Sequence, residues 1–301
     1  MNLNAEERKL RVSIRVKLKK LESARIKDLH QKSRLNWIKY GDENTKFFHA
    51  VVNLNKSRSR INGLNVNGVW VTEPKVIKEN IRRWFKKHFN ESIRRRPTFS
   101  NLGLPSISAE ESETLVMAFS EDEIKIALKG CDGNKAPGPD GFTMKFYKKF
   151  WNHIKPFLVK LMNDFHSSGE ISIGCNSSFL ALIPKSSDPQ NMADYRPISL
   201  VGSIYKIISK LLTNRLKVVM DGLISTTQSA FVGGRNILDG PLVVSEVVSW
   251  SKKKKIKMMV FKVDFEKAYD SINWKFLFRV MELMEFPDKW IGLDKRMHAV
   301  G

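Results

Sequence analysis

Two long stretches of the chain place apolar side chains at every third or fourth position. Such spacing predicts amphipathic helices, and these are stable only when their apolar faces share a core. The first stretch, residues 142–165, has Phe142, Phe146, Tyr147, Phe150, Trp151, Ile154, Leu158, Leu161 and Phe165 at these positions. The second, residues 204–220, has Ile204, Ile207, Ile208, Leu211, Leu212 and Leu216. We interpret the aromatic positions of the first stretch as core contacts and not as a platform for stacking bases.

Shorter patterns complete a mixed fold after residue 110. Ser120 and Glu123 form a capping box for a helix that Gly130 ends, and Ser271 is expected to cap the last helix. The other predicted elements are strands at residues 178–183 and 258–264, a helix at 236–250, and loops at 134–141 and 252–255. Helices followed by a mixture of helices and strands indicate the α+β class.

The first hundred residues have a different character. Residues 5–40 are predicted to form one long helix with a narrow apolar stripe that includes Leu10, Ile14, Leu18 and Leu21. Two Asn-Gly pairs within residues 61–71 predict a hairpin, and Pro74 opens another basic helix. Residues 94–108 are typical of a linker. We therefore predict two domains, a basic helical connector at 1–109 and a second domain at 110–301.

The positive charge is concentrated in that connector. The chain has 301 residues and a formal net charge of +21. Its first 100 residues hold 25 Lys and Arg against 9 Asp and Glu, whereas the other 201 hold 27 against 22. This excess fits a polyanionic partner, with nucleic acid the first choice, or alternatively a basic surface that is only solvated.

Several classes of protein are disfavoured. The two cysteines, Cys131 and Cys175, form neither a disulfide framework nor a zinc motif. No apolar run approaches the roughly 18–20 residues that cross a bilayer, and the N-terminus lacks the apolar core of a signal peptide. The expected location is the nucleus or the cytoplasm.

An acid follows the second predicted strand. Asp264 ends the apolar run MMVFKVD, and a turn and a helix come next. A carboxylate and a backbone carbonyl in such a position suit Mg²⁺, which prefers oxygen ligands. Taken alone, Asp264 is better explained as an ordinary residue at the end of a strand or the start of a helix.

The residues around Asp264 resemble a known motif. KVDFEKAYDS, at residues 262–271, resembles the first catalytic motif of reverse transcriptases from non-LTR (LINE-type) retrotransposons, especially the plant elements. Further matches in the family's order are NKAPGPDGF at 134–142, LIPK at 182–185, DYRPISL at 194–200, YKI at 205–207, NRL at 214–216, and QSAF with Gly234 and Arg235 at 228–235. WIKYGD at 37–42 and NTKFFH at 44–49 resemble the family's connector. The resemblance implies the fingers and part of the palm of a right-hand polymerase.

The resemblance also implies roles for individual residues. Asp264 would bind both metals of a two-metal nucleotidyl transfer, with Mg²⁺ as the metal, and the Phe265 carbonyl would bind one of them. Tyr269 would exclude the 2′-hydroxyl of a ribonucleotide. Lys185 and Arg196 would hold the incoming triphosphate. The structural alternatives are a core aromatic for Tyr269, an exposed lysine for Lys185 and a structural arginine for Arg196.

Three more residues are candidates for contact with an RNA template and a DNA primer. Lys135 would touch the template backbone from the rigid loop 134–141, whose two prolines remove backbone donors. Gln228 and Arg235 would face the template or the nucleotide. Their alternative is to stabilise a loop by hydrogen bonds.

One expected motif is missing from these 301 residues. The family completes its metal site with an Asp-Asp pair, and the chain contains no Asp-Asp dipeptide. Glu285 also stands where the family has a glycine. We therefore expect a truncated reverse transcriptase that is inactive alone. The alternatives are a non-catalytic nucleic-acid-binding remnant and a decayed fragment.

Overall fold

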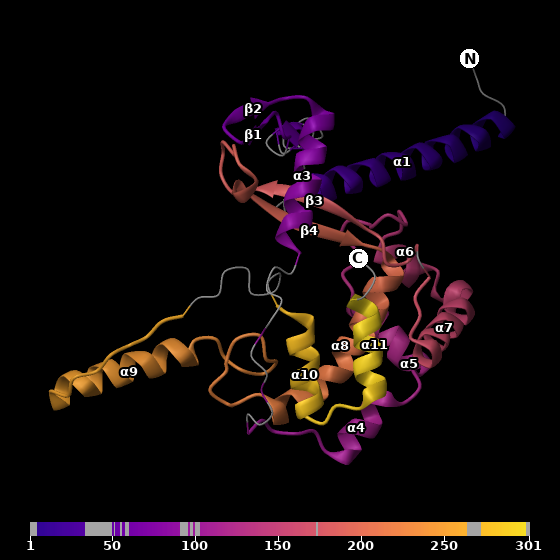
Figure 1. Ribbon diagram of the computed structural model, residues 1–301. Helices are drawn as coiled ribbons and strands as arrows, with labels where there is room; N and C mark the ends of the chain where they lie inside the picture. Colours follow the sequence, from indigo (N-terminus) through magenta and orange to yellow (C-terminus); the bar gives the residue numbers. More distant parts are fainter. Residues whose placement is uncertain are drawn as a thin grey trace. The chain divides into compact units, whose positions relative to one another are not determined.

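The computed structural model divides into two compact units (Figure 1). Unit 1 combines Met1–Lys86 with Leu180–Ile198, and unit 2 combines Lys87–Phe179 with Ser199–Gly301. The structure describes residues 5–33, 50, 52–54, 56–57, 60–90, 96, 99, 103–172, 174–263 and 272–298. Its mixture of helices and two-stranded sheets fits the predicted α+β class. The predicted domain boundary at residue 109 stays a prediction.

Helix α1, Ala5–Ser33, lacks the predicted apolar stripe. Apolar residues occur at every second position from Leu10 to Leu18, and these side chains are all exposed. Residues two apart in a helix point about 200° away from each other, so this alternation spreads apolar side chains around the axis. The prediction was wrong because it counted the four-residue repeat and overlooked the valines at positions 12 and 16.

The predicted hairpin is confirmed in unit 1. Strands β1, Leu64–Val66, and β2, Val69–Val71, pair antiparallel with Leu64 opposite Val71. Asn67 and Gly68 have φ values of 52° and 87° in the turn. Positive φ at both central positions is what a tight hairpin turn requires, and Asn-Gly accommodates it best.

A small core holds unit 1 together. Helix α3, Pro74–His88, begins at the predicted proline. Strands β3, Ser178–Pro184, and β4, Tyr195–Val201, are drawn in opposite directions in Figure 1, with the short helix η1, Met192–Asp194, between them. The backbone N–H of Asn65 donates to the Gln190 carbonyl at 2.9 Å, which ties β1 to this turn. The buried residues of this core are Leu64, Ile77, Phe85, Met192 and Tyr195.

Unit 2 has the larger core, which both predicted amphipathic helices line. Its helices are α4 (Ala109–Val116), α5 (Glu121–Gly130), α6 (Met144–Lys149), α7 (Trp151–Ser168), α8 (Ser203–Leu223), α9 (Asp239–Lys254), α10 (Trp274–Leu283) and α11 (Asp288–His298). Its most deeply buried residues include Leu115, Ile124, Met162, Phe165, Ile207, Ile208, Leu211 and Val219. The predicted capping box of Ser120 and Glu123 is present.

The first amphipathic helix is bent where one continuous helix was predicted. Phe150, at φ −101° and ψ 20°, ends α6 and begins α7. The bend lets α6 pack on α5 while α7 buries Leu158 and Phe165 in the core. Phe142 and Phe150 are exposed, so the interpretation of every aromatic position as a core contact was wrong for these two.

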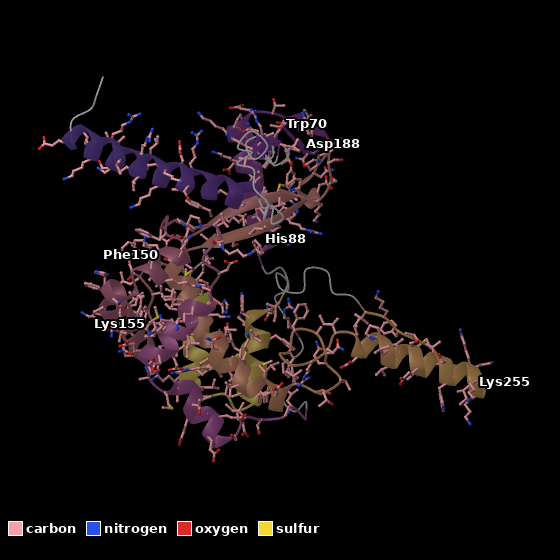
Figure 2. The ribbon with its side chains drawn as sticks, turned by 180° about the vertical axis from the view of Figure 1, so that it is seen from behind. Trp70, His88, Phe150, Lys155, Asp188 and Lys255 are labelled. Carbon is pink, nitrogen blue, oxygen red and sulfur yellow. The ribbon has the colours of Figure 1, made fainter. Side chains whose placement is uncertain are left out.

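Two predictions near residue 255 were wrong. Lys252–Lys254 form the last turn of α9, and Lys255 ends it at φ 56° (Figure 2), whereas a loop was predicted. Cations at a helix C-terminus are favourable because they face the negative end of the helix dipole. Residues 258–263 form no strand with any described residue, and Phe261 is 81% exposed. An apolar run becomes a strand only where a partner supplies hydrogen bonds.

Helix α10 ends in a left-handed residue. Glu285 has φ 60°, and the Phe286 N–H donates to the Met281 carbonyl at 3.0 Å. The Glu285 N–H donates to the Glu282 carbonyl, which completes a Schellman motif. Glycine is favoured at this position because it has no Cβ, so the departure from the family's glycine falls on a strained position. Asn273 caps the start of α10, whereas the predicted cap, Ser271, lies outside the described residues.

None of the helices described is both long enough and apolar enough to cross a membrane.

Candidate functional site

The residues at the centre of the predicted chemistry are not part of the described structure. Asp264, Phe265 and Tyr269 fall in residues 264–271, outside the described ranges. Among the residues that are described, no group of three or more His, Cys, Asp and Glu could hold a metal ion. The metal ligands and the residue that excludes ribonucleotides therefore remain predictions.

The two predicted triphosphate ligands lie in the same hairpin. The backbone N–H of Lys185, directly after β3, donates to the Asp194 carbonyl at 2.7 Å, and Arg196 follows two residues later in β4. The Lys185 ammonium donates to the Ala193 carbonyl at 2.6 Å. The Arg196 side chain is exposed and forms no hydrogen bond or ion pair with any described residue. The hairpin thus presents two exposed cations, and the side chain of one of them, Arg196, has no partner among the residues that the structure describes.

A carboxylate shapes the turn that carries Lys185. The Asp194 side chain accepts the backbone N–H groups of Gln190 and Asn191 at 3.0 and 2.8 Å. The hydrogen bond from the Asn191 backbone is the largest cause that lowers the pKa of Asp194, followed by that from Gln190. Hydrogen bonds to the charged form favour it, so the turn keeps its shape while Asp194 is ionised. Asp194 itself belongs to the DYRPISL motif.

The loop 134–141 is fastened to the start of α8. Asp140 accepts both the backbone N–H of Ser203, at 2.6 Å, and the Ser203 hydroxyl. Gly202 offers no side chain to cap this helix, so Asp140 caps it from 63 residues away in sequence. A Cβ on Gly138 would overlap the Val201 carbonyl, which explains why the loop needs glycine there. The glycines and the acid of PGPDG are therefore structural.

Lys135 projects from that fastened loop. Its side chain is 77% exposed, and its ammonium lies 3.9 Å from Asp132. An exposed pair at this distance contributes little to stability, so the lysine is free to meet another anion. The Lys206 ammonium donates to the Ala136 carbonyl at 3.2 Å and holds the same part of the loop against α8.

Arg235 is engaged by its own loop. Its guanidinium donates to the carbonyls of Ile224, at 2.9 Å, and Gln228, at 2.8 Å, and also to that of Ser225. Gln228 donates from its side chain to the Ala230 carbonyl at 3.1 Å. These contacts agree with the alternative that Gln228 and Arg235 stabilise their loop by hydrogen bonds. A template contact by either residue stays a prediction.

Sequence reasoning gave Arg215 no role, although it is the best-connected charge in unit 2. It is 7% exposed, and its five N–H groups donate to the Glu123 carboxylate, at 2.8 and 3.0 Å, and to three carbonyls, those of Leu115, Met117 and Ala118. The Phe119 ring lies 4.4 Å from the guanidinium carbon. A signal was available, because Arg215 interrupts the apolar stripe of α8 between Leu211 and Val219.

Comparison with protein families gives one match. Residues 183–298 match the family described as reverse transcriptase (RNA-dependent DNA polymerase). The matched range contains Lys185, Arg196, Gln228, Arg235 and the segment around Asp264. Lys135 lies upstream of it.

Similar proteins extend the likeness beyond that range. The Transposon TX1 uncharacterized 149 kDa protein of Xenopus laevis is 27% identical over 94% of this chain and 22% of its own length. The Pol polyprotein of the type-1 retrotransposable element R2 of Nasonia vitripennis is 26% identical over 59% of this chain and 16% of its own length. That of element R1 of Bradysia coprophila is 27% identical over 57% and 17%. The chain thus spans about a fifth of the length of these relatives.

The range of the family match contains several of the motifs found in the sequence, and the structure places two of those motifs, LIPK and DYRPISL, on one hairpin. Residues 183–298 are thus similar to the reverse transcriptase family, and the chain as a whole is similar to proteins named for a transposon and for retrotransposable elements.

Proposed function

We propose that this chain is part of an RNA-directed DNA polymerase of a LINE-type element, of the plant type, and that it supplies the fingers and the first metal ligand of the polymerase. The exposed pair of Lys185 and Arg196 on one hairpin is the observation that carries the proposal. A triphosphate requires cations that the fold leaves unused, and the Arg196 side chain has no partner among the described residues.

In this proposal nucleotidyl transfer would use two Mg²⁺ ions. Asp264 would hold both and the Phe265 carbonyl one, and the metals would supply stabilisation of the charge that develops at the reacting phosphate. Tyr269 excludes ribonucleotides. Lys135, Gln228 and Arg235 face an RNA template and a DNA primer. The nuclear or cytoplasmic location that these substrates require also belongs to the proposal.

Equilibrium binding of a fluorescent deoxynucleoside triphosphate in the presence of Mg²⁺ tests the nucleotide site. Replacement Arg196→Ala is expected to weaken binding about tenfold or more, because a hydrogen bond to a charged group contributes about 1.5–3 kcal/mol. Lys160→Ala, an exposed lysine of α7, is the matched control and should leave affinity unchanged. Equal affinity for all three proteins would refute the proposed nucleotide site.

Primer extension tests the catalytic part. Because these 301 residues contain no Asp-Asp pair, we expect no product from the chain alone with an RNA template and all four deoxynucleotides. Product that disappears in Asp264→Ala would overturn that expectation.

A second candidate function is nucleic-acid binding without catalysis, which the high positive charge of the chain favours. It predicts RNA binding that weakens steeply with salt and is the same in Asp264→Ala. An insoluble chain that binds no RNA would instead indicate a decayed fragment.

A further inference from the structure

Lysines gather on one face of unit 2, where α5, α6 and α8 meet. We propose that this lysine face, made by Lys125, Lys129, Lys148, Lys149, Lys206 and Lys210 together with Lys135, binds the phosphate backbone of a single-stranded nucleic acid. The inference rests on the proposed function and names where in unit 2 the strand lies. Six of its seven lysines have no role in the catalytic proposal.

The first part of the lysine face is a hollow of about 320 Å³ between α5 and the start of α7. Four lysines line it together with Leu128, Trp151 and Asn152, and no carboxylate does; the lysines are Lys125, Lys129, Lys148 and Lys149. Phe150, at the bend beside this hollow, and Lys155, further along α7, are labelled in Figure 2. Glu121, at the start of α5, pairs with Lys155 at 2.9 Å and so does not compete with a phosphate for the lysines of this hollow.

The second part is a hollow of about 490 Å³ between loop 134–141 and α8. Lys135, Lys206 and Lys210 line it with the hydroxyl side chains of Ser209 and Thr213. Asp132 is the one acid in the lining, and it faces Lys135 at 3.9 Å. Phosphate oxygens accept hydrogen bonds from both hydroxyl and ammonium groups, and this hollow offers both kinds of donor.

The two hollows adjoin at the end of α5. The Lys148 ammonium donates to the carbonyl of Lys129, at 2.9 Å, which lines the first hollow, and to that of Cys131, which lines the second. A Cβ on Gly130 would lie 3.0 Å from the side chain of Lys210, so this lysine crosses the same junction. A chain of phosphates could therefore follow both hollows without a break.

The lysines are not neutralised by the fold. In the part of the chain that the structure describes, no carboxylate pairs with Lys125, Lys129, Lys149 or Lys210. Burial raises the pKa of the Cys131 thiol, but Lys210, Lys148 and Lys206 each act in the opposite direction. The Cys131 thiol, which lies at the junction, thus experiences a positive potential from these lysines.

Aromatic rings favour a single strand over a duplex. Phe142, which is 46% exposed, lines the second hollow, whereas Trp151, which lines the first, is half-buried and packs against the core of unit 2. Aromatic rings among cations are the combination that binds unpaired bases and their backbone, since every base has a face that can stack. A duplex presents phosphates but hides its base faces.

Binding of a labelled oligouridylate to the full chain, measured over a range of salt concentrations, tests the proposal. The variant Lys125→Ala/Lys129→Ala/Lys149→Ala avoids the lysines that hold backbone carbonyls. Removal of one lysine that neutralises a phosphate of a single strand reduces the slope of log K against log salt by about 0.7, so the triple variant should reduce the slope by about 2 and bind about 100-fold more weakly at about 0.1 M salt. The same three positions changed to arginine should retain the affinity.

The matched control is Lys160→Ala/Lys217→Ala/Lys275→Ala, which removes three exposed lysines of unit 2 from outside both hollows. It should bind like the parent protein. An equal reduction of slope in both triple variants would overturn the proposal, because charge in general and not the lysine face would then account for binding. An equally lysine-dependent affinity for an RNA duplex would overturn the choice of a single strand.

The outcome is separable from that of the proposed function. Failure of the lysine face leaves the Arg196 effect on nucleotide binding untouched. Conversely, if Arg196→Ala does not change the affinity for the nucleotide, the salt slopes expected for the lysine variants stay the same. Thermal unfolding of each variant confirms that a loss of binding is not a loss of fold.

Discussion

Arg215 and Arg196 show two opposite uses of the same side chain. Arg215 lies in the core of unit 2 with all five N–H groups donated to oxygen atoms. Arg196 lies on the β3–β4 hairpin of unit 1 with no partner among the described residues. A buried guanidinium must be fully paired because desolvation of an unpaired charge is costly, whereas an exposed one costs nothing to leave open. The comparison teaches that the state of its donors separates an arginine that the fold uses from one that stays available to a ligand.

The largest expected effect on stability tests the difference between the two arginines directly. Arg215→Ala should destabilise the protein by about 3–5 kcal/mol, because it leaves the Glu123 carboxylate and three carbonyls without their donor. Arg196→Ala should change stability by less than about 0.5 kcal/mol. Urea unfolding of both variants measures the difference. Similar losses in the two variants would show that the distinction between the arginines is mistaken.

The next effect concerns the loop that Asp140 fastens to α8. Asp140→Ala should cost about 1–2 kcal/mol, since it removes a helix cap and leaves the buried Ser203 N–H unpaired. Asp188→Ala, in the exposed turn of unit 1 (Figure 2), serves as the control and should be close to neutral. A neutral Asp140 variant would mean that the loop does not depend on this cap.

A smaller effect of opposite sign is expected at the end of α10. Glu285→Gly should stabilise the protein by about 0.5–1 kcal/mol, because glycine relieves the left-handed strain and only part of that gain is lost to the greater freedom of the unfolded chain. The neighbouring Met284 has φ −86°, so Met284→Gly should destabilise. Thermal unfolding compares the two. A lower melting temperature for Glu285→Gly would contradict the strain.

The smallest effect is the dependence of stability on pH that arises from Glu123, the partner of Arg215. Burial acts to raise the pKa of Glu123, but the hydrogen bonds from Arg215 and Ser120 and the charge of Arg215 together lower it. A lowered pKa gives stability that is complete above the ordinary glutamate value of about 4.3 and is lost as the pH falls through the folded value. Urea midpoints measured across this acid range should show the loss. Glu123→Gln should remove that component.

Local patterns were predicted well because their causes are local. The capping box of Ser120 and Glu123 needs only residues three apart, and the Asn67-Gly68 turn needs only two residues that tolerate positive φ. The apolar stripe of α8 likewise follows from its own spacing. These features were read correctly without knowledge of any distant segment.

Other features depend on segments far apart in sequence. The residues near Arg215 in sequence do not indicate that carbonyls about a hundred residues earlier accept its hydrogen bonds. The residues near Asp140 likewise do not indicate that it caps a helix that begins at Ser203. The exposed run 258–263 was mistaken for a strand for the same reason, since its composition fits a strand but no described partner pairs with it. The site was therefore found as a set of motifs and not as an arrangement.

The sequence by itself determined the apolar stripe of α8, the capping box of Ser120 and Glu123, the hairpin turn, the concentration of charge in the first hundred residues and the motifs that lie within the range of the family match. These follow from periodicity, backbone preference and residue identity, which need no neighbours. Only the tertiary structure decided that PGPDG holds the start of α8, that Arg215 is used by the core while the Arg196 side chain has no partner among the described residues, and that seven lysines from three helices and one loop line two adjoining hollows. Those facts depend on which distant groups meet and on which polar groups are thereby satisfied, and folding alone sets both.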